Sequence, residues 1–174
     1  KPDVFIGLSS FVTKTIEHCN ENNITSVVDH GSLHPEYEKK IIIEECERIS
    51  IDYKDFIAPA WQIQRMNSEF KNSKKIIVPS DGAKKSMINL GIEEKKINIL
   101  NYAVDNILFK SKKIKKFDKF TIVFCGSLSP RKGVHNLIES FKLANISDSQ
   151  LVLLGAKSRS KDYNKYLKKI STND

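Results

Sequence analysis

Short apolar runs alternate along the chain with longer segments in which apolar positions recur every three or four residues. The apolar runs predict β-strands at residues 3–8, 25–28, 75–78, 97–100, 121–125 and 151–154. The periodic segments predict helices at residues 11–22, 36–49, 61–70, 81–90 and 133–143. Because the strands are mostly apolar and helices separate them, the pattern is typical of an α/β fold whose parallel sheets are covered by helices on both faces.

A polar stretch rich in lysine interrupts this alternation. Lysines occupy positions 110, 112, 113, 115 and 116, directly before Phe117. We therefore predict two Rossmann-like domains with parallel sheets, at residues 1–110 and 118–174, joined by a basic linker at residues 111–117. We expect both domains to be incomplete in this chain, because it starts at Lys1 almost within a strand and ends after a helical pattern.

The carboxyl ends of the predicted strands are the places where such sheets bind ligands, close to the amino ends of the following helices. This rule selects the positions Ser9-Ser10, Asp29-His30-Gly31, Pro79-Ser80, Gly126-Ser127 and Gly155-Ala156. Ser80 has an alternative explanation, because serine is also a common N-cap of helices. His34 is the alternative to His30 as the functional histidine, and a lone histidine is often structural.

The segment from Phe120 to Phe141 contains the most informative pattern. An apolar strand ends at Gly126, where the absence of a Cβ lets a ligand approach the backbone. A short loop then brings Arg131 and Lys132 directly before Gly133 and a helix. Two cations beside the N–H groups of a helix start favour the binding of a diphosphate. The alternative is an ordinary basic loop with a glycine at the helix start.

The charge is spread unevenly over the chain. The net charge is +8, yet residues 1–110 carry 15 basic and 16 acidic side chains, whereas residues 111–174 carry 14 and 5. The basic second part suits a polyanionic partner such as phosphate, an anionic membrane surface or nucleic acid, or it is a solvated surface. The composition is that of a soluble globular protein, and its apolar runs are too short to span a bilayer.

The three cysteines lack the spacing of a zinc site or a CxxC pair. We expect Cys19, Cys46 and Cys125 to be buried, reduced thiols of a cytosolic protein.

The order strand, Gly126, basic loop, Gly133, helix and then LVLLG at residues 151–155 resembles the opening of the donor-binding domain in the family 4 glycosyltransferases, also called glycosyl transferases group 1. Residues 65–80 and 96–105 resemble the end of that family's first domain. The resemblance implies a GT-B fold, in which two Rossmann-like domains are combined. Ser127 stands where many members have an arginine, and Ala103 where they have a glycine.

The resemblance also implies roles for individual residues. Arg131 and Lys132 would hold the diphosphate of the donor, together with Gly126 and Ser127. His30 would contact the reacting sugar or the acceptor, with Asp29 as an orienting carboxylate. Further residues at the strand ends would line the cleft, namely Ser9, Gly31, Ser80 and Gly155. No metal is expected at Asp29, His30 and His34, because Arg and Lys usually neutralise the donor phosphates in this fold.

The implied activity is the transfer of a sugar, with retention at the anomeric carbon, from a nucleoside diphosphate sugar to a hydroxyl of a sugar or lipid-linked acceptor. Bacterial surface polysaccharide or lipopolysaccharide synthesis is the expected pathway, with a cytoplasmic enzyme that contacts the inner membrane face peripherally. The donor substrate replaces any cofactor, and no specific nucleic acid partner is expected. The alternatives are another GT-B enzyme, such as a sugar-nucleotide epimerase, and a non-catalytic basic module that binds polyanions.

The resemblance covers residues 3–157 and leaves out two elements of the family. The glycine-rich loop that opens the first domain is absent, and so is a later pair of glutamates, since no glutamate follows Glu139. We therefore expect this chain to be an inactive fragment of the enzyme.

Overall fold

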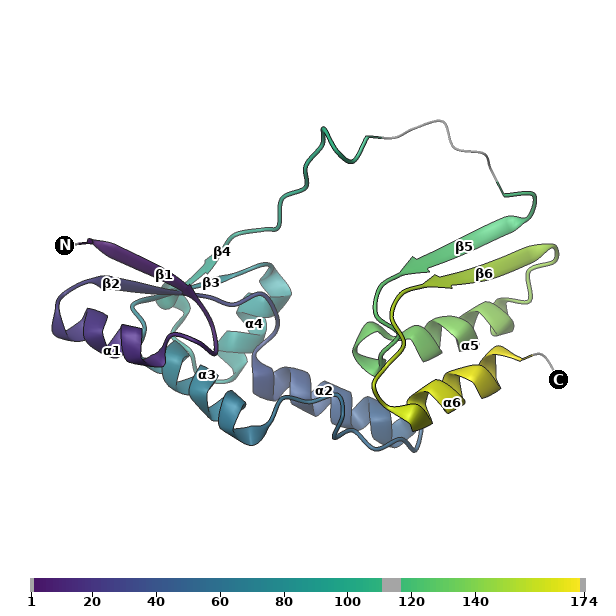
Figure 1. The fold of residues 1–174 in the computed structure, drawn as a ribbon, viewed down its shortest axis with the longest axis horizontal. Coiled ribbons are helices and arrows are strands. Elements are labelled where there is room, and N and C mark those ends of the chain that lie inside the picture. Colours follow the sequence, from purple (N-terminus) through teal and green to yellow (C-terminus); the bar gives the residue numbers. More distant parts are fainter. Residues whose placement is uncertain (1, 111–116, 173–174) are drawn as a thin grey trace. The chain divides into compact units, whose positions relative to one another are not determined.

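The computed structural model describes residues 2–110 and 117–172 (Figure 1). The predicted linker at 111–117 and its lysines therefore lie outside the described residues, apart from Phe117. Contacts divide the chain into two compact units, each described below by itself. Unit 1 comprises Lys1–Ile41 and Ala58–Phe109, and unit 2 comprises Ile42–Ile57 and Lys110–Asp174.

The sheet of unit 1 contains four parallel strands in the order β1-β2-β3-β4. Their bounds are β1 (Val4–Leu8), β2 (Thr25–Asp29), β3 (Lys75–Val78) and β4 (Ile97–Ile99). Four helices contain residues of this unit: α1 (Thr13–Glu21), α3 (Ala60–Asn72), α4 (Asp81–Asn89) and the first half of α2 (Pro35–Arg48). The predicted strands and their parallel pairing are confirmed in this unit.

Helices α1, α3 and α4 lie along one face of this sheet (Figure 1). Val28, Ile76 and Val78 are fully buried there and pack with Phe70 and Met87. Each strand alternates its side chains between the two faces, so the residues between these buried positions face the other side of the sheet.

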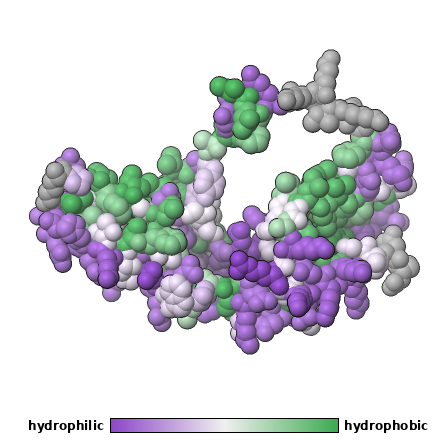
Figure 2. Space-filling view, in the orientation of Figure 1, coloured by the Kyte–Doolittle hydropathy of each residue, from purple (hydrophilic) through white to green (hydrophobic). Residues whose placement is uncertain are grey.

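The opposite face of the sheet carries exposed apolar side chains, which contribute to the green area over this sheet in Figure 2. Val4, Ile6 and Leu8 on β1 are 52%, 60% and 63% exposed. The prediction that helices cover both faces is therefore wrong for the described part of unit 1.

Unit 2 contains a two-stranded parallel sheet of β5 (Phe120–Cys125) and β6 (Ser149–Leu154). Helices α5 (Val134–Ala144) and α6 (Lys161–Ser171) pack on it around Val134, Ile138 and Leu167. Together with the sheet of unit 1, this confirms the predicted α/β class with parallel, Rossmann-like sheets.

The contacts assign the segment Ile42–Ile57 to unit 2, whereas the sequence pattern assigns it to the first domain. The reason is its apolar side chains: Ile49 is buried in the core of unit 2, and Ile51 and Phe56 pack against that core. Apart from this segment, the predicted domain boundaries stay a prediction.

Cys19 and Cys46 are buried, as expected, but Cys125 is exposed. Cys125 is the last residue of β5, and its neighbour on β6 in the same register, Leu154, is 51% exposed. The expectation of a buried thiol is therefore wrong for Cys125, because no described helix covers this face of the strand. In the part of the chain that the structure describes, no helix is long and apolar enough to cross a membrane.

Candidate functional site

The carboxyl ends of β5 and β6 bring two glycine backbones into close contact. The Gly126 N–H donates to the Leu154 carbonyl at 2.8 Å, and the Leu128 N–H donates to the Ala156 carbonyl at 2.9 Å. A Cβ on Gly155 would overlap the Gly126 carbonyl oxygen, so a side chain has no room there. The structure thus brings together three of the predicted site residues, Gly126, Ser127 and Gly155, at one edge of the sheet.

The basic pair lies on a tight turn just beyond this edge. Residues Pro130–Lys132 form a single 3₁₀ turn, in which the Lys132 N–H donates to the Ser129 carbonyl at 3.0 Å. Gly133 closes the turn with a φ of 64°, a left-handed conformation that favours glycine. Helix α5 starts at Val134, and no side chain of the described residues caps its first N–H groups. Arg131 and Lys132 are exposed directly before this helix start.

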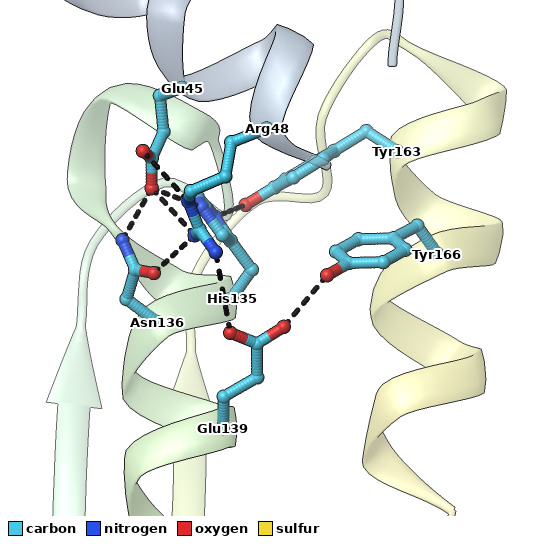
Figure 3. A network of polar contacts seen from close by, with 7 residues as sticks. All are labelled: Glu45, Arg48, His135, Asn136, Glu139, Tyr163 and Tyr166. Carbon is cyan, nitrogen blue, oxygen red and sulfur yellow. Dashed lines mark hydrogen bonds and ion pairs between the residues drawn. The ribbon is translucent and has the colours of Figure 1, made fainter. Parts of the chain in front are cut away.

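A polar network centred on the buried side chain of His135 holds the first turn of α5 in place (Figure 3). His135 is fully buried, with Nε2 at 2.7 Å from the Glu45 carboxylate and Nδ1 at 2.9 Å from the Tyr163 hydroxyl. Asn136, the next residue of α5, also donates to Glu45. Arg48 donates to the same carboxylate at 2.9 Å. Residues of α2, α5 and α6 are therefore joined beside the basic turn.

The network shifts the protonation of its acids. The hydrogen bond from Arg48, with those from Asn136 and His135, lowers the pKa of Glu45 to about 2. Glu45 is therefore a carboxylate at neutral pH, and because a carboxylate only accepts, His135 donates from Nε2. Burial and the hydrogen bond to Glu139 raise the pKa of Tyr166 to about 12, so its hydroxyl stays a donor at 2.8 Å from Glu139.

In unit 1, His30 lies at the end of β2 and is only 6% exposed. Its Nε2 is 2.9 Å from the Leu33 carbonyl and its Nδ1 is 2.8 Å from the Ser9 Oγ. Burial lowers the pKa of His30, although the hydrogen bond to Leu33 and the charge of Glu38 act in the opposite direction. Two predicted site residues, Ser9 and His30, are thus in direct contact, and both nitrogens of the imidazole have partners.

His34 is also buried, but it lies among the helices. Its ring is 5.6 Å from the Phe70 ring, centroid to centroid, and its Nδ1 accepts from the Glu36 N–H at 3.3 Å. Burial, with a smaller effect of His30, lowers the pKa of His34 to about 4. His34 lines a cavity of about 690 Å³ with Phe70 and Ile92. Of the two histidines, only His30 contacts another predicted residue of the strand edge.

The remaining predicted residues of unit 1 have mainly backbone roles. The Asp29 carbonyl accepts from the Ser9 N–H at 3.0 Å, and the Gly31 carbonyl accepts from the Tyr102 hydroxyl at 2.8 Å. The Ser80 Oγ accepts from the Ala83 N–H at 3.2 Å, which makes Ser80 the N-cap of α4. Among the described residues, no group of His, Cys, Asp and Glu side chains is arranged to hold a metal ion.

Two glutamates, buried Glu69 in unit 1 and partly exposed Glu45 in unit 2, organise the segments near the strand ends, and the sequence pattern assigns a role to neither. Glu69 on α3 is 1% exposed and accepts from the Ser10 N–H, the Val12 N–H and the Thr13 hydroxyl. Its signal in the sequence is a carboxylate directly before Phe70, on an otherwise apolar helix face. Glu45 of α2 gives no such signal, because nothing in the sequence distinguishes it from Glu44 and Glu47, the exposed carboxylates of the same helix.

Unit 2 belongs to the class of parallel α/β units. It has glycines at the ends of its strands and a basic turn before a helix, and sheets of this class commonly bind phosphate groups at such places. Residues 105–174 match the family model described as glycosyl transferases group 1. This match confirms the predicted resemblance over β5, α5 and β6 and extends it to α6, and it supports glycosyl transfer as the function. No curated protein matches the chain.

Replacing Gly155 tests the close approach of the strand ends. We expect Gly155→Ala to lower the free energy of unfolding of unit 2 by roughly 1–3 kcal/mol, because its Cβ would overlap the Gly126 backbone. Gly82→Ala in α4 is the control, since the nearest atom to its Cβ is at 3.8 Å, and it should be neutral or stabilising by up to about 1 kcal/mol. Thermal unfolding of the two variants measures this; equal stabilities would contradict the geometry.

Replacing Glu45 tests the polar network around His135. The lowered pKa means that the ionised carboxylate stabilises the folded unit above pH 4.5, and that this contribution is lost as the pH falls from 4.5 towards about 2. We expect Glu45→Gln to cost roughly 1–3 kcal/mol at pH 7 and clearly less at pH 3.

Urea denaturation followed by circular dichroism at the two pH values measures the difference. Glu47→Gln, an exposed position on the same helix, is the control and should change little. A loss in Glu45→Gln that is the same at pH 7 and pH 3 would show that the carboxylate charge is not what stabilises the network.

Proposed function

We propose that this chain is part of a retaining glycosyltransferase, which moves a sugar from a nucleoside diphosphate sugar to a hydroxyl of a sugar or lipid-linked acceptor. The observation that carries the proposal is the position of Arg131 and Lys132, exposed on a turn that ends where α5 begins. The match of residues 105–174 to group 1 glycosyltransferases supports it.

The turn suits a diphosphate for three physical reasons. Two side-chain cations provide charge-assisted hydrogen bonds, which are about twice as strong as neutral ones. The uncapped start of α5 adds backbone N–H donors and the positive end of the helix dipole. Gly126 and Gly155 have no side chains, so only their backbone atoms lie at the adjoining strand ends.

These groups act on the leaving diphosphate. When the bond between the sugar and the diphosphate breaks, negative charge grows on the phosphate oxygen that leaves. Fixed donors aimed at this oxygen stabilise the transition state, and a single such donor is worth roughly 3 kcal/mol. In this proposal Arg131 and Lys132 supply that charge in place of a metal ion, and Ser127 adds a hydroxyl near the strand end.

The strand edge of unit 1 is proposed to contact the reacting sugar or the acceptor, with Ser9, Asp29, His30 and Gly31 as the residues involved. Because both nitrogens of His30 have protein partners, His30 contributes through the Ser9 hydroxyl that it holds. Asp29 is the carboxylate nearest in sequence to this pair.

We further propose that the enzyme acts at the cytoplasmic face of a bacterial membrane, in the synthesis of a surface polysaccharide or lipopolysaccharide. A lipid-linked acceptor would bring the enzyme to that surface, and the excess of basic side chains in residues 111–174 is suited to anionic lipids.

Binding of UDP and GDP tests the diphosphate site. We expect millimolar UDP or GDP to raise the melting temperature by a few degrees, since a ligand at ten times its Kd adds about 1.4 kcal/mol of stability. The double variant Arg131→Ala/Lys132→Ala should weaken binding by at least about tenfold, because it removes two charge-assisted contacts. Lys168→Ala/Lys169→Ala, which removes two exposed lysines of α6, is the charge-matched control and should bind as the wild type does.

The same measurement separates the alternatives. If heparin and polyphosphate stabilise the protein as much as UDP does, and if all three effects fall steeply with salt, the protein binds polyanions non-specifically. Equal loss of UDP binding in Lys168→Ala/Lys169→Ala and in Arg131→Ala/Lys132→Ala would also reject the proposed site.

A further inference from the structure

The hydrogen bonds around His30 fix where its proton lies. A backbone carbonyl can only accept, so the contact of 2.9 Å between Nε2 and the Leu33 carbonyl requires a hydrogen on Nε2. In the neutral ring, Nδ1 is then an acceptor, and its partner at 2.8 Å, the Ser9 Oγ, must be the donor. The lowered pKa of His30, which results from burial, keeps the ring neutral at pH 7.

This assignment determines what Ser9 offers to a ligand. A serine hydroxyl has one hydrogen and two lone pairs, and the hydrogen of Ser9 is directed to His30. Ser9 is only partly buried, so its oxygen can meet a ligand, and it can do so only as an acceptor. Such an oxygen binds a hydroxyl or an N–H group of a ligand and disfavours an anion, which has no hydrogen to donate.

Hydrogen bonds with Glu69 and Arg65 hold the turn that carries Ser9. Ser10 has a φ of 77°, a left-handed conformation that is unusual for serine, and its N–H donates to the buried Glu69 carboxylate. Glu69 also accepts from the Val12 N–H at 2.9 Å, and Arg65 donates to the Ser10 carbonyl at 3.2 Å. These contacts keep the Ser9 hydroxyl beside His30 without help from a ligand.

The same turn exposes an aromatic ring. Phe11 is 80% exposed, although it stands between Ser10 and Val12, which are both buried. Ligand sites commonly combine an aromatic surface with a few placed polar groups, and an exposed ring on the same turn as a hydroxyl acceptor is suited to a molecule with C–H and O–H groups on its surface.

We propose that the Ser9–Phe11 turn is a binding site for a neutral sugar, in which the Ser9 Oγ accepts a hydrogen bond from a sugar hydroxyl and the Phe11 ring contacts the sugar ring. His30 and Glu69 are positioning residues in this site: His30 holds the hydrogen of Ser9, and Glu69 holds the turn. The inference rests on the proposed function for the source of the sugar, which is the acceptor substrate.

The probe is methyl α-D-glucopyranoside, titrated to tens of millimolar into the ¹⁵N-labelled protein. We expect the amide signals of Ser9, Ser10 and Phe11 to shift in the wild type. Ser9→Ala should weaken binding about fivefold, the typical effect of one neutral hydrogen bond. Ser9→Thr keeps the hydroxyl and should retain binding, and Phe11→Ala should weaken it. Sodium sulfate at the same concentration should leave the Ser9 signal unchanged.

The tautomer of His30 tests the premise of the proposal, which is that the hydrogen of Ser9 is directed to the imidazole and its oxygen acts as an acceptor. The ¹⁵N shifts of the imidazole should show hydrogen on Nε2 and none on Nδ1 at pH 7. Hydrogen on Nδ1, unchanged glucoside binding in Ser9→Ala, absence of glucoside shifts at this turn, or equal shifts with sulfate would each overturn the proposal. The proposed diphosphate site belongs to unit 2. A failure of the protein to bind UDP would therefore reject the diphosphate site and not the Ser9–Phe11 site.

Discussion

The candidate donor site depends on the close approach of two backbones, Gly126 after β5 and Gly155 after β6. Because neither residue has a side chain, the hydrogen-bonded pairing of the strands continues past their ends, as far as Leu128 and Ala156. The chain then turns sharply through Pro130–Lys132 and enters α5. A bulkier residue at position 155 would separate the two strand ends, and the basic turn would no longer lie at a fixed place relative to the sheet.

Each unit uses one glutamate to hold a segment near a strand end: Glu69 is buried, whereas Glu45 is partly exposed. Glu69 accepts two backbone N–H groups and a hydroxyl before α1, and Glu45 accepts from His135, Asn136 and Arg48 at the start of α5. A buried carboxylate such as that of Glu69 is costly unless its oxygens are hydrogen-bonded, so the segment around it is stable only when its partners are in place. The same requirement makes the surrounding geometry rigid, which a binding site needs before its ligand arrives.

The strands, the parallel α/β class and the basic turn were predictable, because they depend on local signals. Apolar runs give the strands, and Arg131, Lys132 and Gly133 are adjacent in the sequence. That Ser9 and His30 lie close together was predictable, because each follows a strand and the two strands pair in parallel. The direction of their hydrogen bond was not, because it depends on the position of the Leu33 carbonyl.

Other features depend on contacts between distant parts of the chain. The bond of Glu45 to His135 joins residues 90 positions apart, and nothing near either residue in the sequence indicates it. The packing of Ile49 in unit 2 and the exposure of Cys125 likewise follow from which faces the helices cover, and hydrophobic periodicity does not determine that.

The most direct measurement of the central claim is a chemical-shift map of UDP binding in the ¹⁵N-labelled protein, together with the ³¹P signals of the nucleotide. The account predicts that the largest amide shifts occur from Ser127 to His135, at the basic turn and the first turn of α5, and that the ³¹P signals of UDP move with them. UDP-induced shifts that are absent from this segment, or that are spread evenly over the lysine-rich surface, would contradict it.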